Sequence, residues 1–488
     1  MSNAGLKNTA TRGGVIMMGA KVITIVLHFA FTFILARLLT PEDFGIVAMV
    51  LAITVFAEIF KDAGLSAAAI QRKDLSDDQQ SNLFWLNFAV GLVLTLIVAS
   101  LAPAIAWFYD RTELIAVTLA LSLSFVITGI AEQHRTRLLR DMRFAPNAVA
   151  GVLGMAARLL VAVYLASLGY GYWAIIWGTL SGLLLTSVII VLQSEVKIML
   201  PKRNVGTFDF ISFGARVMVF NCANFFHKNL DNILLGRFFG AGTLGHYTTA
   251  YTLAMYPVSA IRSALNVAFP VLSKLQDDPD QYKHFFLNIV KVISIISVIP
   301  LMFGIVWGDL LLTLFLGPGW EMATKLFVIL CIAGLVHPAG TMREVLLLSL
   351  GRSKKYARWG IYNAAGMTLA FAAGIWWGAF GMAWAYVFGT YLILYPSLRY
   401  VLQGTNIKPK EYLTAMFSSV LLTLPAVAAS FGLHYFLSGK TSDVLLLALI
   451  TATYSIAVLI TVFSVSSERK LVMSVVNMLR KKSTAALK

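Results

Sequence analysis

Long apolar stretches, separated by short breaks rich in polar residues, glycine or proline, make up most of the chain. A helix needs about 20 mainly apolar residues to cross a bilayer, and these stretches reach that length. We therefore predict about 14 transmembrane helices. They lie near residues 13–36, 44–60, 82–107, 113–131, 146–168, 171–193, 208–235, 245–270, 285–308, 322–349, 356–377, 379–400, 411–436 and 441–463.

The amino-acid composition leads to the same class of protein. Of the 488 residues, 58% are hydrophobic and 13% are charged, and the mean hydropathy is +0.78. A soluble core of this size could not bury so much apolar surface, so we expect an all-α integral membrane protein. Cys222 and Cys331 both lie in apolar stretches, which indicates small core residues rather than a disulfide or a metal site.

Lysine and arginine are distributed unevenly among the breaks. About 27 of them lie at the termini and in every second connection, against about 4 in the other connections. This is the positive-inside pattern, so we expect both termini to be cytoplasmic. Despite a formal charge of +16, nucleic-acid binding is not expected, because no single patch gathers the basic residues. The segment 466–488 is predicted to form a basic cytoplasmic tail or an interfacial helix.

The chain matches itself at two shifts, which indicates an internal repeat. At a shift of 200 the matches are Arg37 with Arg237, Gly45 with Gly245, and Asp77-Asp78 with Asp277-Asp278; at 211 they are Trp173 with Trp384 and Gly178 with Gly389. We predict two six-helix lobes of the same orientation, residues 1–200 and 201–405, followed by two additional helices in 406–465. The repeated acidic pairs are interpreted as loop or helix-cap residues.

Several polar and charged residues lie inside the predicted membrane helices. A charge there is costly unless it faces a bundle interior or a water-filled cavity. Lys21 and His28 share one face of the first helix. Most of the remaining candidates lie in the stretch 208–272. The predicted substrate-binding residues are Lys21, His28, Arg216, Asn224, Lys228, Tyr251 and Arg262, and the predicted ion-coupling residues are Glu58 and Asp231.

The strongest of these candidates are cationic, so we predict a cationic cavity that attracts an anionic substrate. Arginine in particular binds phosphate oxygens bidentately. Simpler interpretations exist: Lys228 and Asp231 are three residues apart on one helix and can neutralise each other, and a lone His28 often only packs. Arg158 and Lys291 are interpreted as isolated or snorkelling basic residues rather than functional ones.

The sequence contains none of the common enzyme motifs. It has no phosphate-binding glycine loop at the start of a helix, no nucleophile-elbow serine and no His-Glu-x-x-His motif. We therefore expect no enzyme activity, no cofactor and no bound metal.

Three segments resemble bacterial polysaccharide exporters: Ala36–Gly45, residues 230–237 with Leu244–Tyr247, and Phe269–Lys274. By these segments and their order, residues from about 10 to 465 resemble the Wzx-type polysaccharide (lipid-linked oligosaccharide) flippases of the multidrug/oligosaccharidyl-lipid/polysaccharide exporter superfamily. The resemblance implies a V-shaped pair of lobes around a cavity lined by helices 1, 2, 7 and 8.

The same resemblance implies a function and its partners. The chain is then expected to move undecaprenyl-pyrophosphate-linked oligosaccharide across the bacterial cytoplasmic (inner) membrane by alternating access, for lipopolysaccharide or exopolysaccharide biosynthesis. The polyprenyl tail would stay in the membrane lipid, and a polysaccharide polymerase and chain-length machinery are the implied protein partners.

Two other functions are alternatives to this one. A cation-coupled exporter of drugs or other small solutes, from the same superfamily, would use Glu58 and Asp231 as coupling acids. A membrane-bound polymerase or glycosyltransferase acting on the same lipid carrier would need a large extracytoplasmic loop. The connections on that side are too short to hold one.

Overall fold

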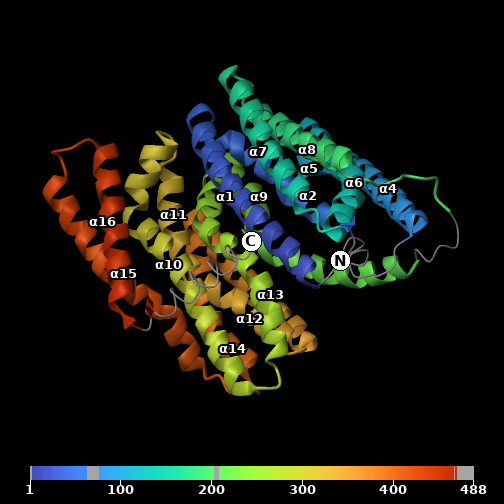
Figure 1. The fold of residues 1–488 in the computed structure, drawn as a ribbon. Helices are drawn as coiled ribbons and strands as arrows, with labels where there is room; N and C mark the ends of the chain where they lie inside the picture. Colours follow the sequence, from blue (N-terminus) through green and yellow to red (C-terminus); the bar gives the residue numbers. More distant parts are fainter. Residues whose placement is uncertain (1–2, 63–75, 203–207, 467, 470–488) are drawn as a thin grey trace. The chain divides into compact units, whose positions relative to one another are not determined.

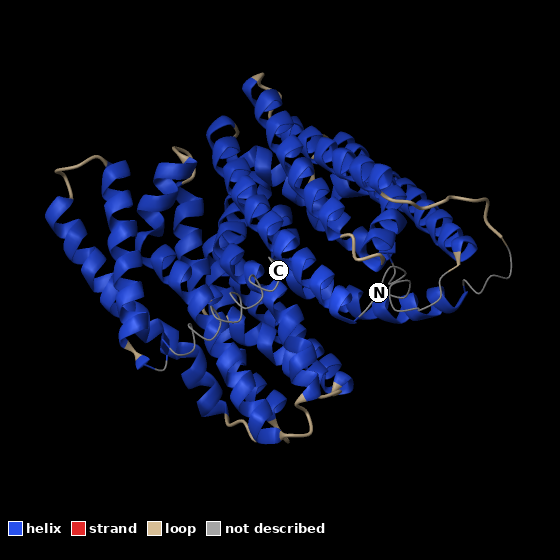
Figure 2. Cartoon of the chain, in the orientation of Figure 1, coloured by secondary structure: helices blue, strands red, loops and turns tan. Residues whose placement is uncertain are grey.

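The computed structural model describes residues 3–62, 76–202, 208–466 and 468–469. Inside these ranges, no side chain is described for residues 3–12, 14–15, 59, 61–62, 208–228, 259–267 and 339. The described residues form helices joined by loops, with no strand among them (Figure 2). Nine of the described helical segments are long and apolar enough to cross a membrane. The prediction of an all-α, multi-pass membrane protein is confirmed at this level, and the count of about 14 stays a prediction.

The helices follow one another along the chain as labelled in Figure 1. The first are α1 Asn3–Leu38, α2 Pro41–Asp62, α4 Asp77–Ser100, α5 Ala102–Tyr109, α6 Leu114–Arg140, α7 Phe144–Ser167, α8 Tyr172–Gln193 and the long α9 Phe208–Lys274. They are followed by α10 Pro279–Leu316, α11 Glu321–Gly334, α12 His337–Ser349, α13 Ser353–Gly374, the short 3₁₀ helix η1 Ile375–Trp377, α14 Gly378–Leu402, α15 Pro409–Leu437 and α16 Asp443–Ser464.

Two predicted helices are interrupted near a proline. The predicted helix at 82–107 is α4 followed by α5, and the one at 322–349 is α11 followed by α12. Pro103 and Pro338 lie in the first turns of α5 and α12. Proline is tolerated in a first turn, where its missing N–H has no helical partner, whereas in a helix interior it removes a hydrogen bond and crowds the preceding turn. The prediction of one continuous helix was therefore wrong in both places.

The range α9 contains two helices that meet at a kink at Gly240. The sequence predicts helices near 208–235 and 245–270, separated by a polar turn. In the structure one helix precedes Gly240 and a second follows it within Phe208–Lys274, and Gly240 itself has non-helical dihedral angles (φ 80°, ψ 177°), in agreement with the two predicted helices. Glycine adopts such a positive φ without the steric cost that a Cβ atom brings. The change of direction between the two predicted helices is therefore concentrated at this glycine.

The chain divides into two compact units, one up to Gly245 and the other from His246 onward. The first contains α1 to α8 and the first part of α9; the second contains the rest of α9 and α10 to α16. This division describes packing, whereas the predicted lobe boundary between residues 200 and 201 describes a sequence repeat. The predicted repeat boundary stays a prediction.

Glycines allow close approach of helices in the first unit. A Cβ on Gly154 of α7 would lie 1.9 Å from Thr186 Oγ1 and 2.8 Å from the carbonyl oxygen of Gly182, both on α8. A Cβ on Gly91 of α4 would lie 2.7 Å from the carbonyl oxygen of Phe125 on α6. In lipid, where helices gain little from hydrophobic burial against one another, such close packing provides much of the attraction between them.

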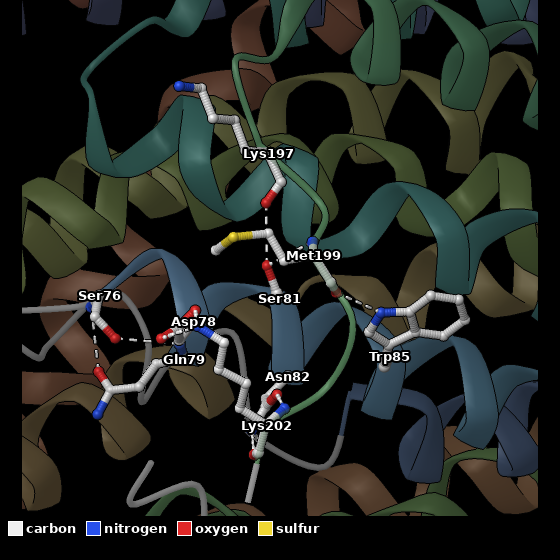
Figure 3. A network of polar contacts seen from close by, with 9 residues as sticks. All are labelled: Ser76, Asp78, Gln79, Ser81, Asn82, Trp85, Lys197, Met199 and Lys202. Atoms are coloured by element: carbon white, nitrogen blue, oxygen red, sulfur yellow. Dashed lines mark hydrogen bonds and ion pairs between the residues drawn. The ribbon is translucent and has the colours of Figure 1, made fainter.

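The segment after α8 folds back along the first turns of α4 (Figure 3). Asn82 Nδ2 donates to the carbonyl oxygen of Lys202 at 2.7 Å, and Asn82 Oδ1 accepts from the Lys202 backbone N–H at 2.9 Å. Trp85 Nε1 donates to the carbonyl oxygen of Met199 at 2.9 Å, and Lys202 Nζ lies 2.9 Å from Asp78. These contacts hold a basic connection against the start of α4.

The repeated acidic pairs lie at or next to helix N-termini, in agreement with their interpretation as loop or helix-cap residues. Ser76 caps α4 by accepting a hydrogen bond from the Gln79 backbone N–H, and the first turn of α4 carries Asp77 and Asp78. Asp278 caps α10. Carboxylates are favourable there because they face the positive end of the helix dipole.

In the second unit, a buried cluster joins α10, α12, α14 and α15 at one end. Its fully buried members include Phe286, Leu346, Leu398 and Tyr412. At the same end, the guanidinium of Arg352 donates to the carbonyl oxygens of Gln403 and Gly404 at 2.7 Å each. Two basic connections of the chain, between α12 and α13 and between α14 and α15, are thereby brought together.

Candidate functional site

Basic side chains from α1 and α7 come together in the first unit. Arg158 lies on α7, which packs along α1, and its guanidinium carbon is 4.3 Å from the centroid of the Phe31 ring. The rings of Phe31 and His28 lie 6.1 Å apart, centroid to centroid. His28 is close enough to Arg158 and Lys21 for both charges to act on it. Lys21, His28 and Arg158 are named here the α1/α7 basic cluster.

The arginine of this cluster is held in place from two sides. Phe31 is only 4% exposed, so its ring offers a fixed surface for the guanidinium. Such a cation–π contact contributes about 0.5–2 kcal/mol. Behind Arg158, a Cβ on Gly182 of α8 would lie 2.9 Å from the Arg158 Cβ, so α8 touches this part of α7 directly. The N–H donors of the guanidinium are thus presented from a defined position.

The cluster is accessible rather than enclosed. Lys21 is exposed, and His28 and Arg158 are half-buried. The neighbouring hydroxyls of Thr24 and Thr32 donate to carbonyl oxygens of their own helix, those of Ala20 and His28, at 2.8 and 3.1 Å. Their protons are therefore used inside α1. The Lys21 ammonium and the Arg158 guanidinium are the charged groups of the cluster, and a phosphate is an anion that such groups bind by charge-assisted hydrogen bonds.

Most of the other predicted site residues lie outside the described side chains or apart from this cluster. No side chain is described for Arg216, Asn224, Lys228 and Arg262, all on α9. Of the predicted ion-coupling residues, Glu58 is exposed on α2, whereas Asp231 is only 5% exposed on α9 and accepts from the Asn232 backbone N–H at 2.9 Å. The roles predicted for these six residues stay predictions.

Tyr251 belongs to an aromatic network in the second unit. Its hydroxyl lies 3.5 Å from that of Tyr386 on α14, and the Tyr386 hydroxyl lies 2.5 Å from Nε2 of His337 on α12. Tyr247 stacks on Tyr251 and Phe371 on Tyr386. Sequence reasoning missed His337 and Tyr386. The signal was the His-Pro pair inside an apolar stretch, because discontinuous helices often form transporter binding sites.

Arg343 is a further polar residue that sequence reasoning missed. It lies on α12, is 6% exposed, and its guanidinium carbon is 5.3 Å from the centroid of the Trp359 ring. Among the described residues, neither Nε nor Nη1 of Arg343 has a hydrogen-bond partner. A buried charge without hydrogen-bond partners is energetically expensive. Packing alone therefore does not explain why an arginine occupies this position.

A cavity of about 610 Å³ lies beside the connection between α5 and α6 in the first unit. Arg111 lines it, and its Nη1 lies 2.6 Å from Glu42 and 3.0 Å from Glu113. Partial burial lowers the pKa of Arg111, but its hydrogen bonds to the two carboxylates outweigh this and raise the pKa. Because the two carboxylates already neutralise the arginine, this cavity is a poorer anion site than the α1/α7 basic cluster.

The chain is similar to proteins of polysaccharide biosynthesis. Residues 34–325 match the family described as polysaccharide biosynthesis protein. The chain is 31% identical over 389 residues to the teichuronic acid biosynthesis protein TuaB of Bacillus subtilis, covering 76% of this chain and 79% of that protein. It is 25% identical to the lipopolysaccharide biosynthesis protein WzxC of Escherichia coli, with 86% and 87% covered.

Two further comparisons span nearly the whole chain. The succinoglycan biosynthesis transport protein ExoT of Rhizobium meliloti is 25% identical, with 96% of this chain and 95% of that protein covered. Among solved structures, the lipid II flippase MurJ in an inward closed conformation has a TM-score of 0.75 at 13% identity, covering 94% of this chain and 100% of that chain. At that identity, the likeness to MurJ concerns the fold alone.

Proposed function

Because the chain belongs to the polysaccharide biosynthesis protein family, we propose that it is a flippase for undecaprenyl-pyrophosphate-linked oligosaccharide repeat units. The α1/α7 basic cluster carries this proposal. It presents Arg158 and Lys21 on two neighbouring helices of a membrane protein, and a pyrophosphate is an anion that both can bind. The relatives named for teichuronic acid, lipopolysaccharide and succinoglycan biosynthesis support this class of substrate.

The proposed orientation follows from charge. We place the protein in the bacterial cytoplasmic (inner) membrane with both termini in the cytoplasm, because the basic connections lie on that side under the positive-inside rule. The pyrophosphate would enter from the cytoplasm, while the polyprenyl tail stays in lipid. Alternating access would then release the headgroup on the other side, and no covalent bond of the substrate would change.

The candidate residues of α9 are part of the same proposal. Arg216 and Arg262 would add two guanidinium groups to Lys21 and Arg158, while Lys228, Asn224 and Tyr251 would offer further hydrogen bonds to the pyrophosphate or to sugars. The proposed partners are the lipid-linked oligosaccharide itself, membrane lipid, and a polysaccharide polymerase with its chain-length machinery on the side of release.

Chemical analysis of the lipid-linked sugars in cells lacking the protein tests this function. We expect repeat units to accumulate on the cytoplasmic side and the wild-type gene to clear them. The variant Arg158→Gln should lower export at least about tenfold, because a hydrogen bond to a charged group contributes about 1.5–3 kcal/mol. Arg143→Gln is the matched control, since Arg143 pairs with exposed Glu195 at a helix end.

Three results would contradict the proposal. If Arg158→Gln exported as much polysaccharide as the wild type, the α1/α7 basic cluster would take no part in transport. Accumulation of repeat units on the periplasmic side would favour a polymerase instead. Drug sensitivity of the deletion strain, with polysaccharide intact, would favour the small-solute exporter with Glu58 and Asp231 as coupling acids.

A further inference from the structure

A basic groove lies at one end of the second unit, between α10 and α15, which pack side by side (Figure 1). Its volume is about 430 Å³. Three of the residues that line it are lysines and one is acidic. The polar residues that matter here are Asn288 and Lys291 from α10, and Lys408, Lys410 and Glu411 at the start of α15.

Both carboxylate oxygens of Glu411, the acidic residue of the groove, accept hydrogen bonds from neighbouring residues. Glu411 Oε1 accepts from Lys283 Nζ at 2.7 Å, and Oε2 accepts from the Lys408 backbone N–H at 2.9 Å. Lys408 and Lys410 are exposed, and within the described part of the chain neither ammonium makes an ion pair. Within the described ranges, Lys410 therefore has no carboxylate partner, whereas the charge of Lys408 is felt by the Glu411 carboxylate without a direct ion pair.

Lys291 lies deeper in the groove than these two lysines. It is eight residues beyond Lys283 on α10, which corresponds to about 12 Å along the helix axis. Its ammonium pairs with Glu468, which follows α16 and is 3% exposed. Next to it, the amide of Asn288 makes no hydrogen bond to any other described residue, so its two N–H donors are available.

The remaining wall is suited to a lipid rather than to a free ion. Leu287 and Ala415 form an apolar surface beside the lysines. The hydroxyls of Thr414 and Ser418 donate to carbonyl oxygens of their own helix at 2.9 and 3.1 Å, and so add no donor to the groove. The groove thus combines cationic donors with an apolar surface beside them.

We propose that this groove binds the phosphate headgroup of an anionic phospholipid that is not transported, with Lys408, Lys410 and Asn288 as donors. Basic pockets between membrane helices on the cytoplasmic side bind anionic headgroups in this way. That the lipid belongs to the cytoplasmic leaflet rests on the orientation proposed above. Glu468 competes with the phosphate for Lys291, which couples lipid binding to the chain segment that follows α16.

Native mass spectrometry of the full-length protein, with phosphatidylglycerol, phosphatidylcholine or inorganic phosphate added, tests the proposal. We expect phosphatidylglycerol to be retained in preference to phosphatidylcholine, and phosphate to neither bind nor displace it. Lys408→Gln combined with Lys410→Gln should lower its retention at least about tenfold, because each lysine near an anionic headgroup contributes about 1 kcal/mol. Glu468→Gln should raise retention by freeing Lys291.

The matched control is Lys354→Gln, an exposed lysine of α13 that does not line the groove. It should leave phosphatidylglycerol retention unchanged. Equal retention of the two phospholipids, or no effect of the double lysine variant, would overturn the proposal. Binding of inorganic phosphate alone would also overturn it, because the groove would then be a general anion site. If undecaprenyl pyrophosphate displaced phosphatidylglycerol from the groove, the groove would instead be an entry site for the substrate. Lipid retention is measured without any transport, so the lipid-binding proposal and the proposed flippase function can fail independently of each other.

Discussion

Gly45 on α2 and Gly245 on α9 each lie against a backbone carbonyl of the other helix, four residues before the other glycine. A Cβ on Gly45 would lie 1.7 Å from the carbonyl oxygen of Ala241, and a Cβ on Gly245 would lie 1.8 Å from the carbonyl oxygen of Pro41. Both glycines and both carbonyls are separated by 200 residues, which is one of the two shifts of the sequence repeat. The two glycines let α2 and the first part of α9 approach closely, while the predicted repeat stays a prediction.

The first prediction concerns this close approach. Gly45→Ala or Gly245→Ala should lower the apparent melting temperature of the purified protein, because the added methyl group overlaps a backbone carbonyl that cannot move alone. Overpacking of this kind costs about 1–3 kcal/mol. Gly242→Ala is the control on the same helix, since a Cβ at Gly242 meets no atom within 4 Å. An unchanged melting temperature in the first two variants would show that the helices separate at little cost.

The second prediction concerns the ring beneath Arg158. Phe31→Leu keeps an apolar side chain but removes the aromatic face, so export should fall about two- to fivefold while the protein remains in the membrane. In an Arg158→Gln background the same change should have no further effect on export, because the two residues act as one pair. Phe33→Leu is the control, since Phe33 stacks on Phe29. If Phe31→Leu lowered export equally in the wild-type and the Arg158→Gln backgrounds, Phe31 would act independently of Arg158.

The third prediction concerns the hydrogen bond between His337 and Tyr386. Tyr386→Phe should reduce the free energy of unfolding by about 1–3 kcal/mol, because it leaves the half-buried His337 nitrogen without its partner. Thermal unfolding followed by intrinsic fluorescence measures the change. Tyr395→Phe on the same helix, where the tyrosine is 56% exposed, should be neutral. If both variants melted like the wild type, the hydrogen bond would contribute nothing measurable to the free energy of unfolding.

The fourth prediction concerns Arg343. Arg343→Met should raise the melting temperature, because replacing a buried charge by an apolar side chain of similar volume often stabilises by about 1–4 kcal/mol. If export is lost at the same time, the arginine is retained for transport. Arg358→Met, at an exposed position of α13, should change neither stability nor export. A lower melting temperature in Arg343→Met would instead mean that the charge is satisfied inside the bundle.

The sequence by itself determined that the chain is an all-α, multi-pass membrane protein. Apolar length decides which segments enter a bilayer, and this property is local, so it can be read without a fold. Helix caps such as Asp278 are equally local, because a cap bonds to a residue three positions along the chain. The shift that pairs Gly45 with Gly245 is also a property of the sequence, and the internal repeat that it predicts stays a prediction.

Only the tertiary structure decided which polar residues meet. Arg158 looked isolated because its partners, Phe31 and His28, lie on a helix more than 120 residues away in the chain. Likewise, the break before Pro338 places His337 against Tyr386, on a helix that the hydropathy pattern does not connect with it. Hydropathy reports how a residue partitions between water and lipid, whereas the neighbours of a side chain depend on how helices pack. That packing brings together distant positions that no local pattern specifies.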